Sequence, residues 1–142
     1  MTYEITLNSY DFSDKFLRLY AVACARAAIA LIKNPDPRSI KAIDIAEAYA
    51  YGKATEAELA TAHENAYAAC AAYYAADTAA CAAYAAATAA TATAAYYATA
   101  TAAYYAASAA TKGVDVDKIL ENMIKDHYTE LELLVLYKGT AA

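Results

Sequence analysis

Residues 78–111 run for 34 residues without a charged residue, a glycine or a proline, and without leucine, isoleucine, valine or phenylalanine. Twenty of these residues are alanine, seven are threonine and five are tyrosine. Alanine has the highest helix propensity and nothing in the segment breaks a helix, so the composition predicts a long helix over 78–111. Because large aliphatic side chains are missing, this helix must pack through small residues and tyrosines.

A membrane span and an ice-binding face are two alternative interpretations of this segment. It is longer than the ~20 residues that cross a bilayer, but insertion depends on the large apolar side chains that it lacks, so we expect no membrane partner. Ice binding would need threonines repeated every eleven residues. Thr88 and Thr99 fit that repeat, but the next positions are Asp77 and Ala110, which ends the array at two threonines.

Close helix packing fits the segment better, because helical spacing separates its small residues from its large ones. A seam of small side chains, suited to close approach of a second helix, comprises Thr91, Ala95, Ala98, Ala102 and Ala109. The opposite side carries Tyr97, Thr101 and Tyr104, flanked by Tyr96 and Tyr105. Tyrosine combines a large apolar area with a hydroxyl, so we hypothesise a protein interface at these five residues; the alternative is that the first and last helices cover them.

Helix caps and stops divide the whole chain, 142 residues long, into a single all-α domain with about five helices. Residues 1–12 form an N-terminal segment that we expect to begin extended, because Tyr3, Ile5 and Leu7 alternate with polar residues. An alanine-rich helical region over 55–111 should break near Asp77 and Thr78. The predicted helices are 13–33, 37–51, 55–76, 78–111 and an amphipathic C-terminal helix over 115–137.

Six local signals support these limits. Ser13, Asp36 and Asp115 are suitable N-caps, and Pro37 fits a first helical position. Gly52 can supply a left-handed stop, and Thr55 with Glu58 forms a capping box. The predicted apolar stripes are Phe16, Tyr20, Ala23, Ala27 and Leu31; Ile40, Ile43, Ala46 and Ala50; and Val116, Ile119, Leu120, Met123, Ile124, Tyr128 and Leu131.

The net charge and the absence of known motifs argue against several classes of function. The net charge of −5 argues against a nucleic-acid partner, which needs a basic surface. The first residues lack a secretory signal, so we expect a cytoplasmic protein. Cys24, Cys70 and Cys81 have no metal-site spacing, and we interpret them as small buried residues. We expect no catalytic, cofactor-binding or metal-binding residues, and therefore no enzyme.

Two stretches carry a family resemblance: "LRLYAVACARAAIALI" and "PDPRSIKAIDIAEAYAYGKATEAELATAHENA", followed by the alanine-rich run. Together they resemble the alanine-rich helical family of immunity proteins of the Imm-5-like type. The resemblance covers about 17–110 and is most specific over 35–59. It implies an all-helical fold and a role in binding and neutralising a protein toxin, with no catalytic residues to carry over. The chain departs from the family in its tyrosines and threonines, which replace tryptophan or histidine in the repeat, and in the apolar helix after Gly113.

Two functions therefore stay open. The first is a non-enzymatic protein-binding module, immunity-like or inhibitor-like, that acts through a tyrosine-bearing surface. The second is a structural protein that associates with further copies of itself into a homo-oligomer or filament. The size of the protein in solution should distinguish them.

Overall fold

A computed structural model of the chain describes residues 2–31, 34–73 and 114–138, and every regular element in these ranges is a helix. This confirms the predicted all-α class. The only backbone pairing of the β type within the described ranges is an isolated bridge between Tyr10 and Tyr137. The helices are α1 Tyr3–Ser9, α2 Asp14–Ile29, α3 Pro37–Ala50, α4 Glu56–Tyr73, α7 Val116–His127 and α8 Glu130–Leu136.

The predicted helix starts are confirmed by their caps. The Ser13 hydroxyl accepts from the Phe16 amide at 3.1 Å, and the Asp115 carboxylate accepts from the Lys118 amide at 3.0 Å. At α3, Asp36 is the N-cap and Pro37 takes the first helical position. Each of these starts depends on groups within three residues of one another, so the sequence could predict it.

The join between α3 and α4 also follows its local signals. Gly52 has φ of +73°, the left-handed conformation expected of a residue that ends a helix. The Thr55 hydroxyl accepts from the Glu58 amide at 3.1 Å, while the Glu58 carboxylate accepts from the Thr55 amide at 3.3 Å. The predicted capping box is therefore present, and it begins α4 at Glu56.

The expected extended start of the chain is wrong, because Tyr3–Ser9 is helical. The Thr6 and Ser9 hydroxyls donate to carbonyls one turn back, on Thr2 at 3.0 Å and Ile5 at 2.7 Å. Their hydroxyls are thus satisfied within the helix, and alternation no longer decides which side chains are buried. Leu7 enters the core, whereas Ile5 is exposed.

Two other predicted limits need correction. The helix predicted over 13–33 ends at Ile29, so Leu31 lies beyond it and is exposed. The helix predicted over 115–137 is two helices, because a new capping box at Thr129 and Glu132 starts α8. The predicted end of the helix at 76, the break at 77–78 and the helix over 78–111 lie outside the described residues.

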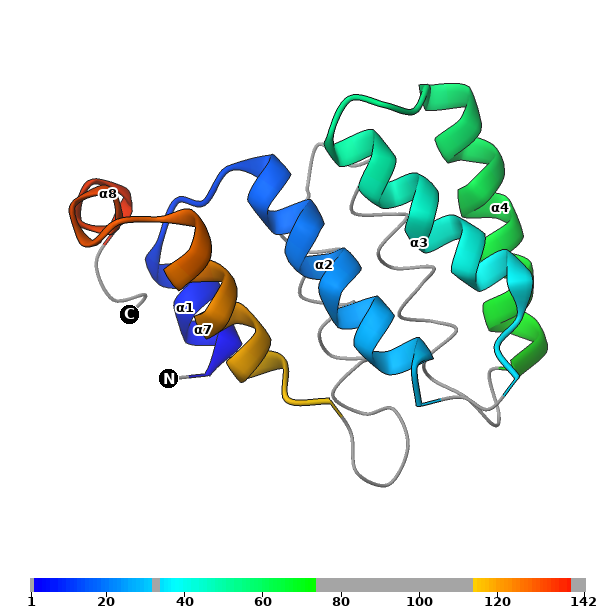
Figure 1. Cartoon of the computed structure of the whole chain (residues 1–142), viewed down its shortest axis with the longest axis horizontal. Coiled ribbons are helices and arrows are strands. Elements are labelled where there is room, and N and C mark those ends of the chain that lie inside the picture. The colour runs from blue at the N-terminus through cyan, green and yellow to red at the C-terminus, as the bar shows by residue number, and fades with distance from the viewer. Residues whose placement is uncertain (1, 32–33, 74–113, 139–142) are drawn as a thin grey trace.

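Five of the helices form a row, with α2 in the middle (Figure 1). On one side of α2 lie α7 and then α1, and on the other side lie α3 and then α4. The short α8 is at the edge of the molecule, near α1 and α7 and far from α4. The central position of α2 explains why it buries residues on most of its circumference, which are Phe16, Leu17, Tyr20, Ala21, Val22, Cys24, Ala25 and Ala28.

The core draws on all five helices of the row. Leu7, Ile43, Leu59 and Leu120 are almost completely buried and join the α2 residues in one cluster. The fully buried Tyr20 donates its hydroxyl to the Val116 carbonyl at 2.9 Å, which ties α2 to the start of α7. The predicted stripes are confirmed at these contacts but fail at Ile40, Leu31 and Leu131, which are exposed.

Candidate protein-binding surfaces

The two surfaces predicted from the sequence lie outside the described residues. These are the tyrosine patch of Tyr96, Tyr97, Thr101, Tyr104 and Tyr105, and the small-residue seam of Thr91, Ala95, Ala98, Ala102 and Ala109. Both stay predictions. The described helices carry two other surfaces that could receive a partner, one between α3 and α4 and one around α8.

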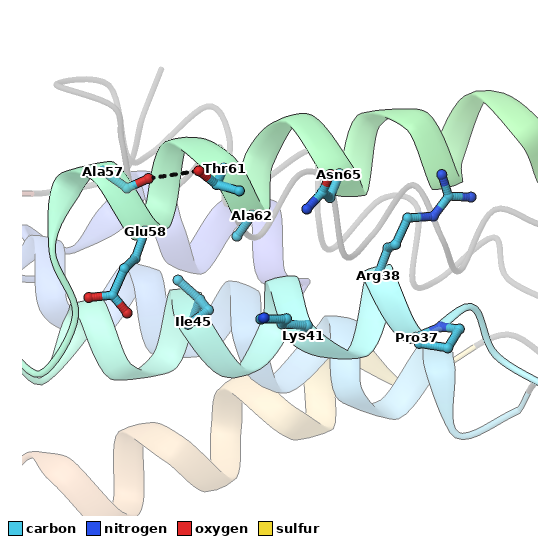
Figure 2. Close-up of a pocket in the computed structure, with 9 residues that line it drawn as sticks. All are labelled: Pro37, Arg38, Lys41, Ile45, Ala57, Glu58, Thr61, Ala62 and Asn65. Atoms are coloured by element: carbon cyan, nitrogen blue, oxygen red, sulfur yellow. Dashed lines mark hydrogen bonds between the residues drawn. The ribbon is translucent and has the colours of Figure 1, made fainter.

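Figure 2 shows the first surface, a groove of about 480 Å³ between α3 and α4. The residues on α4 are mostly short, so the two helices leave a hollow between them, and Arg38 reaches from α3 toward α4. The lining residues are Pro37, Arg38, Lys41 and Ile45 from α3, and Ala57, Glu58, Thr61, Ala62 and Asn65 from α4.

Several polar side chains of this groove already form hydrogen bonds with residues near the start of their own helix. The Glu58 carboxylate caps Thr55, and the Thr61 hydroxyl donates to the Ala57 carbonyl at 3.1 Å. The Arg38 guanidinium donates to Asp36 at 2.7 Å, and this hydrogen bond lowers the pKa of the Asp36 carboxyl below its usual value. Because these polar groups already have partners within the protein, the groove is better suited to bind an apolar side chain than a polar ligand.

The second surface is the outer side of α8, which we call the α8 face: Leu131, Leu134 and Val135. These side chains are 73%, 73% and 81% exposed, and spacings of three and four residues place them on one side of the helix. The other side of α8 is apolar too, and its Leu133 and Leu136 pack, partly buried, against the core. Since α8 fully buries none of its residues, its apolar surface is divided between the core and solvent.

Two hollows lie beside the α8 face. The first, of about 450 Å³, is lined by Tyr10, Glu130, Leu133, Leu134 and Tyr137. The second, of about 320 Å³, lies between α1, α7 and α8 and shares Tyr10 and Leu133 with the first; its other lining residues are Thr6, Asp117, Leu120, Glu121, Ile124 and Lys125. Leu134 thus both projects from α8 and forms a wall of the first hollow.

Backbone contacts hold α8 in this position. The Asp11 amide donates to the Leu136 carbonyl, and the Lys138 amide donates to the Ser9 carbonyl, each at 2.8 Å. Between them the rings of Tyr10 and Tyr137 pack with their centroids 5.5 Å apart. The end of α8 is therefore attached to the end of α1, although the two helices are more than 100 residues apart in the sequence.

Charged residues mark the two ends of α8. Glu130 and Glu132 occupy its first turn, and Lys138 follows its last turn. Glu132 accepts from the Thr129 amide at 2.7 Å, and this hydrogen bond lowers the pKa of the Glu132 carboxyl. The α8 face is thus an apolar strip with negative charge at one end and positive charge at the other.

Two titratable side chains, Cys24 and Tyr20, are fully buried in the core. Cys24 is fully buried as predicted, and burial raises the pKa of its thiol to about 12, so it stays protonated and weakly nucleophilic at neutral pH. Burial likewise raises the pKa of Tyr20 well above its usual value. His127 is exposed at the end of α7, and its Nδ1 lies 2.9 Å from the Met123 carbonyl oxygen.

The described ranges contain neither a candidate metal site nor a candidate membrane span. In 2–31, 34–73 and 114–138, no group of three histidine, cysteine, aspartate or glutamate residues is placed to hold a metal ion. Among the helices of those same ranges, none has the length and hydropathy required to cross a membrane.

The comparisons with known proteins also leave the function open. No family model, no curated protein and no solved structure matches this chain. The surfaces described above must therefore be interpreted from their own chemistry.

The α8 face is the surface that the sequence interpretation missed. Thr129 followed by Glu132 has the same capping-box spacing as Thr55 and Glu58, and Glu132 lies within the apolar stretch LELLVL of residues 131–136. That signal could have located the break. It was hidden because the apolar stripe of the preceding helix continues in register through Leu131.

Proposed function

We propose that this protein is a non-enzymatic helical binding module, which holds a protein partner against the α8 face. One observation carries the proposal: Leu131, Leu134 and Val135 are at least 73% exposed side by side on one short helix. Single exposed leucines are common, whereas the largest contiguous apolar patch on a protein surface is often a functional one. Tyr137, which is also exposed, lies next to the α8 face and extends its apolar surface.

The surroundings of the face support a protein as the ligand. Aliphatic side chains that project into solvent need a partner with matching hollows, and a second protein supplies both hollows and a polar rim. Glu130, Glu121 and Lys125 lie around the two hollows and can form that rim. A nucleic acid would instead need a basic surface, and the chain has a net charge of −5.

In this proposal the protein acts by sequestering its partner in the cytoplasm. The resemblance to immunity proteins favours an immunity-like or inhibitor-like role, in which a toxin is held and no covalent bond is made or broken. The tyrosine patch predicted at Tyr96–Tyr105 would provide a second contact. The described core is compatible with this role, because it keeps Cys24 and Tyr20 buried and protonated.

Site-specific photocrosslinking tests the proposal and does not require the partner to be identified first. Leu131→p-benzoylphenylalanine places an aromatic photocrosslinker on the α8 face, and Glu64→p-benzoylphenylalanine places it on an exposed position of α4 as the matched control. After irradiation in the cells that produce the protein, we expect one discrete adduct from position 131 and none of that mass from position 64. Equal labelling at both positions, or no discrete adduct at 131, would contradict the proposal.

A further inference from the structure

We infer that the partner on the α8 face is a second copy of this chain, packed with its α8 antiparallel to the first across a two-fold axis. This inference rests on the proposed function, because it keeps the α8 face as a protein-binding surface. The occupant is then a second copy and not a toxin, which is the self-associating function that the sequence left open. A symmetric dimer of this kind uses one patch twice, so the patch must be complementary to itself. The α8 surface meets that requirement in shape and in charge.

The shape requirement is that projections and hollows lie next to each other. Leu131 and Val135 project from α8, and the hollow of about 450 Å³ opens beside Leu134. Apart from Glu130, its lining consists of Tyr10, Leu133, Leu134 and Tyr137, which offer apolar or aromatic walls. Two copies facing each other can therefore each insert an aliphatic side chain into the hollow of the other. Because projection and hollow are neighbours on one surface, the contact closes as a dimer and does not propagate.

The charge requirement selects the antiparallel direction. The first turn of α8 carries Glu130 and Glu132, and Lys138 follows its last turn with its amide fixed to the Ser9 carbonyl at 2.8 Å. Antiparallel packing brings Glu130 of each copy toward Lys138 of the other, twice in the dimer. Parallel packing would instead place the two acidic ends together, and it would also align the two helix dipoles unfavourably.

The size of the surface predicts a reversible dimer. A standard stable interface buries about 800 Å² on each partner and involves about 20–30 residues, whereas the α8 face consists of three aliphatic side chains on one short helix. The hollow between Tyr10 and α7, with Glu121 and Lys125 at its border, extends the contact and supplies a polar rim. We therefore expect monomer and dimer to exchange with a dissociation constant in the micromolar range.

Sedimentation velocity of the full chain from about 1 to about 300 µM tests the association. We expect the mean mass to rise from 15.0 kDa toward twice that value across this range. Val135→Glu should weaken association at least tenfold with unchanged circular dichroism and thermal melting, because its side chain is 81% exposed in the monomer. Leu31→Glu is the matched control, an exposed aliphatic residue after α2, and should leave association unchanged.

A charge exchange tests the direction. Glu130→Lys alone and Lys138→Glu alone should each weaken self-association, because each places like charges together at both ends of the paired helices. An equimolar mixture of the two variants restores opposite charges at both ends, so we expect a mixed dimer with close to the original affinity. Destabilisation of α8 by either substitution would not be repaired by mixing, and failure of the mixture to associate overturns the antiparallel arrangement.

The outcomes separate this inference from the proposed function. A chain that stays monomeric up to about 300 µM, while position 131 crosslinks to a different protein, overturns the second copy as partner and leaves the binding function in place. A monomer without a discrete crosslink at 131 overturns both. A dimer that is insensitive to Val135→Glu shows that association uses another surface, which also overturns the inference.

Discussion

Replacement of Tyr20 by phenylalanine isolates one hydrogen bond in the centre of the molecule. The Tyr20 side chain is fully buried, and its hydroxyl donates to the Val116 carbonyl at 2.9 Å and also contacts the Cys24 thiol. Tyr20→Phe removes one oxygen atom and keeps the ring that fills the core. The variant therefore changes the bond between α2 and α7 with little change in packing.

The expected loss of stability depends on the hydrogen bonds that the Val116 carbonyl and the Cys24 thiol retain in the variant. Val116 is the first residue of α7, where its carbonyl also faces the amide of the next helical turn, so it retains one donor. The thiol of Cys24 is a weak hydrogen-bonding group and contributes less. A buried neutral hydrogen bond contributes about 0.5–1.5 kcal/mol, so we expect the free energy of unfolding to fall by about 1–1.5 kcal/mol.

Urea unfolding followed by circular dichroism measures this difference, with an unchanged m value as the check that only stability has changed. Tyr51→Phe is the matched control, because the Tyr51 ring is exposed and packs under the Lys15 ammonium at 4.7 Å without a buried hydroxyl bond. We expect the control to change stability by less than about 0.5 kcal/mol. Equal effects of the two substitutions, or no effect of Tyr20→Phe, would refute the role assigned to the hydroxyl.

Three further predictions concern single groups in the described core and turns. Ser39 is fully buried and its hydroxyl has no hydrogen-bond partner among the described residues, so Ser39→Ala should raise the free energy of unfolding by about 1 kcal/mol; a lower melting temperature would contradict this. At Gly52, φ is +73° and an added Cβ would meet no atom within 4 Å, so Gly52→Ala should cost about 1 kcal/mol from backbone strain alone, and Gly52→Asn should cost less in the same denaturation assay. Burial raises the pKa of Cys24 from 9.0 to about 12, so the folded state holds a proton that the unfolded state releases; the contribution of this thiol to stability should be constant below pH 9 and fall as pH rises toward 12, by up to about 1.4 kcal/mol per pH unit. Cys24→Ala should flatten that fall, and an unchanged pH profile would show that the thiol does not contribute to it.

The helix starts could be predicted because a cap is a property of neighbouring residues. Ser13, Asp36, Thr55 and Asp115 each bond to an amide two or three residues ahead, and no distant contact decides the outcome. The class of the fold follows from these starts. The limits that failed are those where the stripe pattern was used without a cap, as at Leu31 beyond the end of α2.

The first helix could not be predicted in the same way, because its stability depends on distant residues. Tyr3–Ser9 is only seven residues long, and helices of this length are marginal without tertiary contacts. The Tyr3 amide donates to the Asp117 carboxylate on α7, and Leu7 enters a core formed mostly by α2 and α7. Asp117 and the other residues of α7 are more than 100 residues away in the sequence, so alternation of Tyr3, Ile5 and Leu7 gave the wrong element.

The candidate site depends on a second property that periodicity does not contain, the direction of the chain after His127. If α7 continued straight, Leu131 would follow Ile124 by two turns and Val135 would follow Tyr128 by two turns, on the stripe that packs against the core. The extended backbone at Tyr128 and Thr129 ends that register, and α8 starts in a new orientation. The same residues that would have continued a buried stripe are therefore exposed.

The break between α7 and α8 leaves apolar side chains exposed. Complete burial of a leucine or valine side chain stabilises a protein by about 1.5–3 kcal/mol, and α8 leaves three such side chains mostly in solvent. The break is nevertheless well specified, since Thr129 and Glu132 form a complete capping box and two backbone hydrogen bonds attach the end of α8 to residues 9–11. Positions where well-formed local structure opposes burial are where functional sites are expected. Antiparallel packing of a second copy on the α8 face would remove Leu131, Leu134 and Val135 from water. The free energy of burying these side chains, which does not stabilise the fold of the monomer, would then stabilise the dimer.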